Sequence, residues 1–197
     1  MSEAGGARQQ RLPPDPDGRR RCGWATSAPE YIAYHDDEWG RALHGDRALF
    51  ERLSLEAFQS GLSWLIILRK RAAFRAAFAD FDVPAVAAFD EGDVERLLSD
   101  PSIVRNRAKI ESTISNARRI VDAVPEGLDN LLWSFAPARH RRPRRLADVP
   151  AVSPESTAMA RELRKRGLKF VGPTTAYALM QATGMVDDHI ATCWRAV

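Results

Sequence analysis

Apolar residues recur at helical spacing along almost the whole chain, and this periodicity restricts the fold more than any other feature. Between residues 103 and 124, apolar side chains step by threes, fours and sevens, as in one long amphipathic helix. The same spacing predicts a helix from Asp46, as its cap, to about Ser60, and a second helix from Ser63 onward. No segment alternates convincingly between apolar and polar residues as a half-buried strand does. We therefore predict an all-α fold.

Capping residues, prolines and glycines delimit further helices. The predicted segments begin at residue 82, run from 90 to about 99, and cover 128–135, 153–167 and 173–184. Residues 136–152 are rich in Pro and Arg and predict a connecting loop. Residues 1–20 hold few large apolar side chains and many Gly, Pro and charged residues. We therefore predict a disordered tail, followed by one helical domain over residues 21–197.

The composition restricts where such a protein works. Hydrophobic residues make up 45% of the 197 positions, which is enough for a core. No run approaches the roughly eighteen apolar residues of a membrane span, and the N-terminal residues lack the apolar stretch of a signal peptide. We therefore expect a cytoplasmic protein that does not enter a membrane.

Positive charge is concentrated in one short segment. The stretch "RHRRPRR", residues 139–145, holds five arginines, whereas the whole chain has a net charge of only +3. Without these arginines the remainder would carry −2, since +3 minus 5 is −2. The segment is either a solvated loop or a patch that contacts phosphates, and its sequence leaves both interpretations open.

Two cysteines and two histidines have the composition of a zinc site. Because no export is expected, a disulfide between Cys22 and Cys193 is not. Together with His35 and His189 they form a Cys2His2 set, which suits tetrahedral zinc. Four protein ligands leave no open position, so such a zinc would be structural, and it would join the first ordered segment to the last. Taken singly, each residue is equally consistent with a buried core position.

Glu56 occupies an unexpected position in the helix that begins at Asp46. It follows Leu49 by seven residues and Leu53 by three, which places it on the stripe that faces the core. A buried carboxylate is costly unless a cation or hydrogen-bond donors compensate it. The compensating group is either a neighbouring arginine or something that the protein binds.

The segment "KRGLKFVGPTTAYALMQATG", residues 165–184, predicts two helices joined by a tight turn. Backbone N–H groups at the start of the second helix are free to bind a phosphate. An ordinary helical hairpin has the same spacing. The turn resembles the helix-hairpin-helix DNA-binding motif, whose pattern reads L-P-G-V-G-x-x-T-A. Gly172 matches the second glycine, but Phe170 replaces the first, so the turn must differ there.

Several longer blocks resemble the 3-methyladenine DNA glycosylase I (TAG) family over residues 21–193. They are "RCGW" at 21–24, "YIAYHDDEWG" at 31–40, "LEAFQSGLSW" at 55–64, "RNRAKI" at 105–110 and "KRGLKFVGPTTAYALMQATGMVDDH" at 165–189, followed by Cys193. The resemblance implies a helix-hairpin-helix glycosylase fold with zinc on Cys22, His35, His189 and Cys193. It implies double-stranded DNA containing alkylated adenine as the partner, and we expect a monomer.

The same resemblance implies the site residues. The base pocket carries over to Tyr31, Tyr34, Glu56 and Trp64, with Trp24 and Trp39 nearby. The loop that intercalates into DNA carries over to Gly61 and Leu62. In the helix-hairpin-helix turn, Lys169, Gly172 and Thr174 are the expected contacts to the DNA backbone.

The implied substrate explains why a carboxylate would face the pocket. Adenine methylated at N3 in DNA is cationic, so its bond to deoxyribose is already weak. Glu56 would select this charged base over neutral adenine, and Trp64 would stack on it with cation–π attraction. Leu62 would fill the space that the flipped base leaves. Plain core packing remains the alternative for Trp64.

Two positions differ from patterns in related glycosylases. Broader helix-hairpin-helix glycosylases place a catalytic aspartate in V-D-x-H, where many TAG members have Asn, and this chain has Asp187. We therefore name Asp187 as a second catalytic candidate beside Glu56. Bifunctional relatives place a lysine where this chain has Thr174, so we predict hydrolysis by water without a lyase step.

Two other functions remain open. One is a non-catalytic, zinc-stapled DNA-binding module that has no working pocket. The other is a zinc-stapled helical interaction domain whose arginine segment binds an acidic protein.

Overall fold

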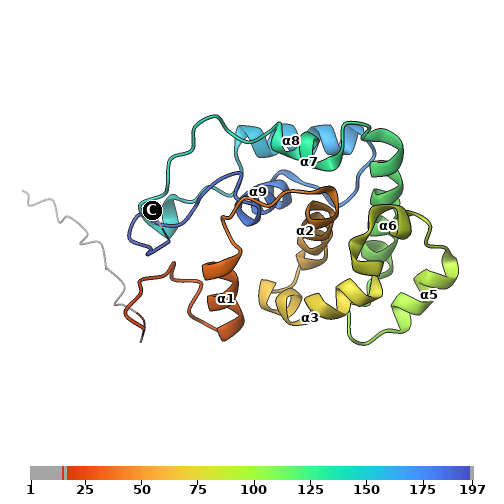
Figure 1. Ribbon diagram of the computed structural model, residues 1–197, viewed down its shortest axis with the longest axis horizontal. Helices are drawn as coiled ribbons and strands as arrows, with labels where there is room; N and C mark the ends of the chain where they lie inside the picture. The colour runs from red at the N-terminus through yellow and green to blue at the C-terminus, as the bar shows by residue number, and fades with distance from the viewer. Residues whose placement is uncertain (1–14, 16, 196–197) are drawn as a thin grey trace, which may run out of the picture.

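The computed structural model describes residue 15 and residues 17–195, and every regular element in this part of the chain is helical (Figure 1). The α-helices are α1 (Pro29–Asp37), α2 (Asp46–Gln59), α3 (Trp64–Ala77), α4 (Val83–Ala87), α5 (Glu91–Ser99), α6 (Arg107–Ala123), α7 (Leu128–Trp133), α8 (Pro154–Lys165) and α9 (Pro173–Ala182). Two short 3-10 helices are η1 (Ala79–Phe81) and η2 (Leu146–Asp148). The prediction of an all-α fold is confirmed for the described residues.

Most predicted helix starts agree with the structure because the capping chemistry is local. Asp82, Asp90 and Ser153 each cap a helix through a side-chain oxygen that accepts from the backbone N–H three residues later. Gly167 and Gly184 both adopt positive φ just after a helix, where glycine is favoured. The three capping side chains bond within their own helix starts, so these boundaries can be read from the local sequence.

Two predicted starts were wrong. Asn106 caps α6, so Ile103 lies in the preceding turn although its side chain is buried. Gly45 occupies the N-cap of α2, and the Asp46 carboxylate instead accepts from the backbone N–H of Asp129 at 2.9 Å. We did not predict α1, because charged residues interrupt the apolar spacing of this short helix.

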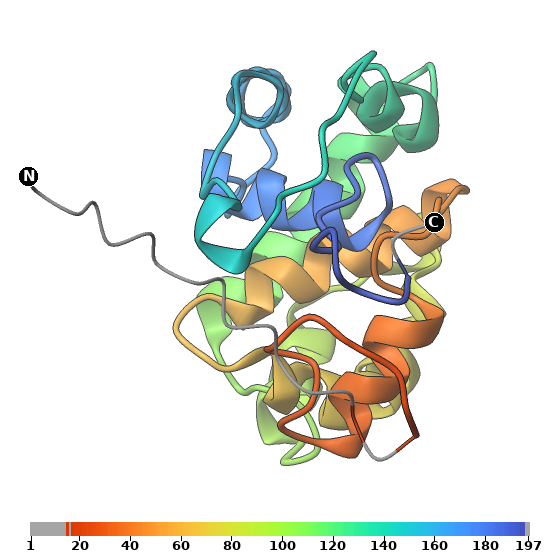
Figure 2. The same ribbon diagram turned by 90° about the vertical axis from the view of Figure 1, so that its left-hand side faces the viewer.

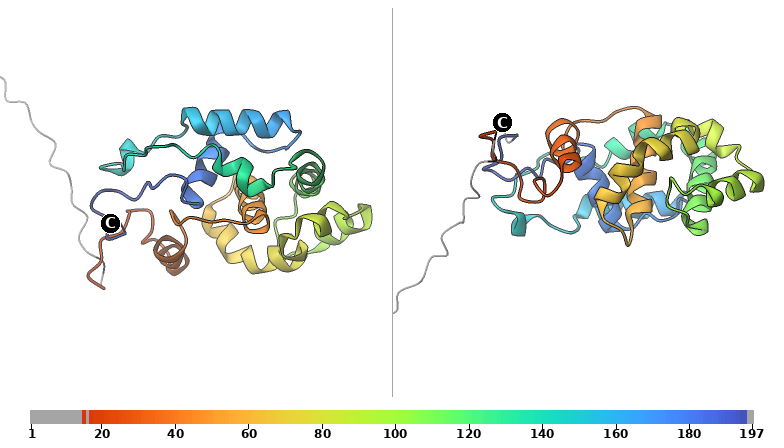
Figure 3. Two further views of the ribbon diagram at one scale, coloured as in Figure 1. Left: turned by 45° about the horizontal axis from the view of Figure 1, so that its top comes forward. Right: turned by 90° about the horizontal axis from the view of Figure 1, so that it is seen from below.

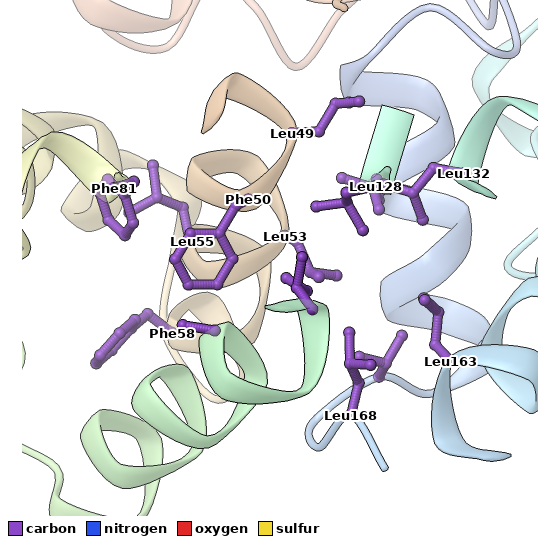
Figure 4. Packing of buried hydrophobic residues seen from close by; sticks show 14 of the residues in the cluster. Leu49, Phe50, Leu53, Leu55, Phe58, Phe81, Leu128, Leu132, Leu163 and Leu168 are labelled. Atoms are coloured by element: carbon purple, nitrogen blue, oxygen red, sulfur yellow. The ribbon is translucent and has the colours of Figure 1, made fainter. Parts of the chain in front are cut away.

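The core surrounds α2, which runs through the centre of the molecule (Figures 1 and 4). Nine of its fourteen residues are buried, and Phe58 packs against Phe74 of α3 with ring centroids 4.6 Å apart. Leu128 and Leu132 of α7 face α2, and Leu163 of α8 belongs to the same cluster (Figure 4). Replacing such a phenylalanine with alanine typically costs about 3–5 kcal/mol. The central position of α2 therefore holds the side chains on its buried faces in place.

A second, smaller apolar cluster joins α1 to the segment that follows α9. Figures 2 and 3 show the last described residues, in dark blue, beside the first ones, in red. The backbone N–H of Trp194 donates to the carbonyl oxygen of Arg20 at 2.7 Å. Trp64, at the start of α3, packs against both clusters. The junction between the two clusters is therefore lined by aromatic side chains.

The predicted tail falls mostly on residues 1–14 and 16, which lie outside the described residues. Within the described part, Asp15 and Asp17 both accept hydrogen bonds from the guanidinium of Arg21, at 2.7 and 3.0 Å from Nη1. None of the described helices is both long enough and apolar enough to cross a membrane.

Candidate active site and metal centre

A cavity of about 750 Å³ opens where α1, α2, the start of α3, α9 and η2 meet. Its lining includes all six residues that the resemblance assigned to a base pocket: Trp24, Tyr31, Tyr34, Trp39, Glu56 and Trp64. α1 contributes Tyr31 and Tyr34 from one face, since residues three apart lie together on a helix. The structure therefore brings these six side chains, which are far apart in the sequence, into one site.

The aromatic side chains of the cavity pack edge to face. Trp24 lies 5.1 Å from Trp39 and 5.8 Å from Tyr31, both between ring centroids and both nearly perpendicular. Tyr34 and Trp64 are tilted, with centroids 5.6 Å apart. The Tyr31 hydroxyl accepts from the backbone N–H of Leu65 at 3.1 Å, which ties α1 to the start of α3. These contacts give the cavity rigid apolar walls that suit a flat ring.

Glu56 is a buried carboxylate that faces this cavity without an ion-pair partner within 4 Å among the described residues. Burial raises the pKa of Glu56 to about 7, and the nearby charge of Arg52 opposes that rise. The expected alternative, a carboxylate permanently paired with an arginine, is therefore not what the structure contains. A donor or a cation in the cavity would supply the compensation that the protein lacks.

A charge network lies behind the aromatic wall. The guanidinium of Arg52 is buried, donates to the Tyr34 hydroxyl at 3.3 Å, and lies 5.8 Å from the ring centroid of Trp64. Glu38 accepts from Arg52 at 3.2 Å and from Arg71 at 2.7 Å. Burial favours the neutral form of Glu38, but Arg71 and Arg52 outweigh it and lower its pKa. The network therefore holds Arg52 as a fixed cation near Glu56.

Trp64 has an unpaired donor. Its Nε1 atom is buried and has no hydrogen-bond partner among the described residues. Together with the unpaired Glu56 carboxylate, it leaves a donor and an acceptor at the cavity without protein partners. Polar groups in this state favour a ligand that pairs with them.

Asp187 does not line the cavity, whereas the adjacent Asp188 does. Oδ2 of Asp188 accepts from the Tyr177 hydroxyl at 2.8 Å and from Nε2 of Gln181 at 2.7 Å. Nε2 of His140 lies 2.9 Å from its Oδ1 atom. The catalytic role expected for Asp187 stays a prediction, and the sequence pattern V-D-x-H gave no reason to select Asp188.

The sequence also gave no indication that the arginine-rich loop reaches the cavity. Leu146 and Val149, at and after η2, line the cavity opposite α2. Beside the contact of His140 with Asp188, the loop is held to the segment after α9 by Arg142, which binds the Asp187 carboxylate, and by Pro143, whose carbonyl accepts from the N–H of Ala191 at 3.0 Å. This loop is therefore part of the site as well as a carrier of charge.

Gly61 and Leu62 lie in the turn between α2 and α3, next to the cavity residue Gln59. Gly61 is exposed with φ of +81°, and a Cβ there would meet no atom within 4 Å. Glycine is therefore needed for the backbone conformation and not for space. Leu62 is half-buried against the main core.

The turn between α8 and α9 contains the three expected backbone-contact residues, Lys169, Gly172 and Thr174. Gly172 is the N-cap of α9, and no side chain caps this helix start. Lys169 is exposed, and its backbone N–H donates to Oδ1 of Asn116 at 2.7 Å. Phe170 adopts φ of +56°, so the position that is usually glycine keeps a left-handed conformation here.

The four predicted metal ligands converge at the second apolar cluster. The ligand atoms of Cys22, His35, His189 and Cys193 all lie within 4.8 Å of one another, and all four residues are buried. Sγ of Cys193 lies 3.4 Å from Nε2 of His35 and 3.7 Å from Nδ1 of His189. Tetrahedral zinc with ordinary bond lengths places sulfur and nitrogen ligands about 3.6 Å apart. The donor set and its spacing therefore fit zinc.

Neighbouring groups orient both histidine ligands. Nδ1 of His35 lies 2.8 Å from Oδ1 of Asp36, and Nε2 of His189 lies 3.2 Å from the carbonyl oxygen of Trp39. Histidines that bind metals usually donate their second ring N–H to such acceptors. His189 and Cys193 do not share a helix, because residues 189–193 form an irregular segment that ends in a turn.

Comparisons with known proteins agree with this geometry. A family model described as methyladenine glycosylase matches residues 24–196. DNA-3-methyladenine glycosylase 1 of Escherichia coli K12 is 44% identical over 177 residues, which cover 88% of this chain and 95% of that protein. A Haemophilus influenzae DNA-3-methyladenine glycosylase is 38% identical and covers 88% of this chain and 96% of its own length.

Solved structures give the same result. The structure that describes 3-methyladenine recognition by glycosylase I (TAG) from Staphylococcus aureus has a TM-score of 0.84 and 32% identity. It covers 90% of this chain and 96% of the other. The family model spans more than half of the chain, and the resemblance in the sequence blocks is thereby confirmed. The chain belongs to the methyladenine glycosylase family.

Proposed function

We propose that this protein removes 3-methyladenine from alkylated double-stranded DNA by hydrolysing the N-glycosidic bond, as a step of base excision repair. The observation that carries the proposal is an unpaired, buried Glu56 that faces an aromatic cavity. A neutral purine cannot compensate that charge, whereas a purine methylated at N3 in DNA is cationic. The relatives that are named for this activity share 38–44% of their aligned residues with the chain.

The proposed pocket separates the damaged base from normal adenine by charge and shape. Trp64 and Tyr34 stack against the flipped ring, and a cationic ring gains attraction from their π faces. The Glu56 carboxylate accepts from the exocyclic amine and balances the positive charge. Trp24, Tyr31 and Trp39 close the remaining walls. Because Glu56 has a pKa near 7, binding of a cation favours its ionised form.

The chemistry requires little acid catalysis. The bond from the sugar carbon to the base breaks, and its electron pair neutralises the departing methylated purine. A water molecule then adds to the sugar carbon and loses a proton to solvent. The pocket supports this step by holding the charged base out of the helix and away from re-stacking. With Thr174 where bifunctional relatives have lysine, we expect no covalent imine with the sugar.

We propose that two turns hold the DNA. Leu62, presented by Gly61, enters the space left by the flipped base. Lys169, Gly172 and Thr174, in the turn before and at the start of α9, bind a phosphate through a cation, a backbone N–H group and a hydroxyl, as a helix-hairpin-helix motif does. A monomer in the bacterial cytoplasm is sufficient for this task.

We also propose that Cys22, His35, His189 and Cys193 hold a structural zinc ion. When bound, the metal supplies rigidity by joining the segment before α1 to the segment after α9. Tyr31, Tyr34 and Trp39 lie in or just after the helix that carries His35. The metal therefore positions one wall of the base pocket and takes no part in the chemistry.

A base-release assay tests the proposal. The protein is incubated with DNA treated with a methylating agent, and the released bases are separated by chromatography. We expect free 3-methyladenine from the wild type and a large loss with Glu56→Ala. A non-catalytic DNA-binding module would bind the duplex and release no base. Trapping with borohydride should yield no covalent complex with DNA, and a trapped complex would contradict the absence of a lyase step.

A further inference from the structure

We infer that Lys109 is a positioning residue that fixes the turn carrying Leu62, and thereby makes this turn stiff enough to enter the DNA. The inference rests on the proposed function, because it assigns a cause to the rigidity which that function requires. Lys109 lies outside the cavity and has no place in the chemistry described above. Its ammonium group nevertheless ends next to the turn.

Lys109 is a buried lysine whose Nζ atom donates to two main-chain oxygens. One is the carbonyl of Phe58 at 2.8 Å and the other is the carbonyl of Ser60 at 2.6 Å. These carbonyls belong to the end of α2, where the helix leaves its last oxygens without internal partners. Lys109 therefore replaces the missing helical hydrogen bonds at the point where the turn begins.

The helix that carries Lys109 does not explain its position. Lys109 lies in the first turn of α6, where its backbone N–H donates to the Asn106 cap at 3.1 Å. A cation near the start of its own helix is unfavourable, whereas a cation at the end of another helix is favourable. Burial also lowers the pKa of the Lys109 ammonium. The position of the Lys109 ammonium therefore destabilises the start of α6 slightly and stabilises the end of α2.

The second carbonyl determines which type of turn forms. Ser60 has φ of −50° and ψ of 117°, Gly61 has φ of +81°, and the N–H of Leu62 donates to the Gln59 carbonyl at 2.7 Å. These values define a type II turn. In a type I turn, the central peptide is flipped and the Ser60 carbonyl points to the opposite side. A hydrogen bond from Lys109 to this carbonyl therefore holds the central peptide in the type II orientation.

Gln59 holds the turn from its other end. Its side-chain Nε2 donates to the carbonyl oxygen of Leu62 at 3.0 Å, and the same residue lines the base cavity. The turn is therefore clamped on both sides, by Lys109 before Gly61 and by Gln59 at Leu62. A glycine-containing turn without these bonds would lose its defined conformation, because Gly has more backbone freedom than any other residue.

A clamp of this kind should affect base extrusion and leave base binding intact. A leucine that enters the duplex must keep the neighbouring bases from stacking again. A flexible turn must first be ordered, so the insertion of Leu62 becomes less favourable. Binding of free 3-methyladenine requires the cavity alone. Release of the base from single-stranded DNA requires no opening of a duplex. A variant that only loosens the turn should therefore lose activity on duplex DNA alone. A variant that damages the fold should lose activity on duplex and on single-stranded DNA.

The test compares Lys109→Met with Lys70→Met as a matched control. Lys70 also donates to two backbone carbonyls, those of Pro101 and Ser102 at 3.0 and 2.9 Å, but these lie away from the cavity. Each variant is assayed for 3-methyladenine release from methylated duplex and methylated single-stranded DNA, and for affinity toward free 3-methyladenine. We expect Lys109→Met to lose about tenfold on duplex, the effect of a hydrogen bond from a charged group. Its rate on single-stranded DNA and its affinity for free 3-methyladenine should match the wild type. Lys70→Met should match the wild type in all three measurements.

A spectroscopic measurement reports on the turn without turnover. 2-Aminopurine is placed opposite a tetrahydrofuran abasic site, and its fluorescence is recorded at saturating protein. We expect wild type and Lys70→Met to change the signal, and Lys109→Met to change it less, as Leu62→Ala does. If Lys109→Met does not fold, Lys109→Gln takes its place; its shorter, neutral side chain weakens the bonds to the two carbonyls, so it should show the same selective loss on duplex DNA.

Two results would overturn the inference. One is an equal loss on duplex and on single-stranded DNA, and the other is an unchanged rate on duplex. Failure of the proposed function is distinct, because wild-type protein would then release no 3-methyladenine from any methylated DNA.

Discussion

Nε of Arg142 donates to Oδ2 of Asp187 at 2.8 Å, and this contact ties the arginine-rich loop to the segment that carries His189. Oδ1 of the same carboxylate accepts from the backbone N–H of His189 at 3.1 Å. Both oxygens of Asp187 therefore have protein partners, and the side chain lies outside the cavity lining. Asp187 therefore joins two segments, at the position where the resemblance to broader helix-hairpin-helix glycosylases predicts a catalytic aspartate.

If the contact between Arg142 and Asp187 only holds the structure together, replacing either residue should have the same effect on stability and activity. Asp187→Asn and Arg142→Gln remove the same half-exposed ion pair, so each should lower the free energy of unfolding by less than about 1 kcal/mol. We expect similar, small losses of base-release rate in both variants. A loss of most activity in Asp187→Asn alone, with DNA affinity retained, would instead support a catalytic role.

The buried charge of Glu56 predicts an unusual dependence of stability on pH. Its pKa rises from 4.5 when unfolded to about 7 when folded, so the folded state binds more protons between these values. Wild-type stability therefore decreases as pH rises through this window, and the full penalty is present above pH 7. Glu56→Gln should be more stable than wild type by about 3 kcal/mol at pH 8 and by less than about 1 kcal/mol at pH 5. Urea denaturation at both values measures the difference, and equal gains at pH 5 and pH 8 would contradict it.

Removal of the metal should loosen one wall of the pocket. We expect about one zinc ion per chain by elemental analysis. A strong chelator, or Cys22→Ser, should lower the melting temperature and weaken the binding of free 3-methyladenine. Trp24 and Trp39 flank His35, so tryptophan fluorescence should change in parallel. An apoprotein with an unchanged melting temperature would show that the four side chains are merely core residues.

Gly184 should tolerate no side chain. A Cβ there would lie 2.5 Å from the backbone carbon of Arg41 and 2.7 Å from the nitrogen of Ala42, and φ is +73°. Gly45 also has positive φ, at +94°, but a Cβ would meet no atom within 4 Å. Gly45→Ala should therefore cost only the conformational penalty of about 1–2 kcal/mol, whereas Gly184→Ala should cost clearly more. Thermal unfolding of the two variants makes the comparison.

The arginine-rich loop should add affinity for DNA without selecting damage. Arg144 is exposed two residues before Leu146, which lines the cavity. If Arg144 contacts a phosphate, Arg144→Ser should lower the slope of log affinity against log salt by about 0.9, equally for methylated and untreated duplex. Arg47→Ser, at the far end of α2 from the cavity, is the charge-matched control and should leave the slope unchanged. Tight binding of an acidic protein with no effect on DNA would favour the other interpretation of the loop.

The sequence predicted the local features of the fold well because their causes are local. Caps such as Asp90 and Ser153 define helix starts through bonds to residues three positions away. Glu56 could be placed on a buried face from periodicity alone. α1 was missed because its burial comes from long-range contacts, through Tyr34 and His35, that no spacing within nine residues reveals.

The site was only partly predictable for the same reason. The six pocket residues came from the resemblance, and the cavity joins them from three helices, α1, α2 and α3, and from the segments just before and after α1. Asp188, Gln59 and Leu146 were not foreseen, because their place in the cavity depends on how α2, η2 and the segment after α9 come together in three dimensions. Arg142 could not be matched to Asp187, which lies 45 positions further along the sequence.

The meeting of His35 with Cys193 has a consequence for biosynthesis. Tyr31 and Tyr34 leave the ribosome long before Cys193 does. The contact of His35 with Cys193, which supports the α1 wall of the pocket, therefore cannot form until nearly all of the described chain has been translated. If the four residues hold zinc as proposed, binding of the metal would be the last step that completes this wall of the pocket.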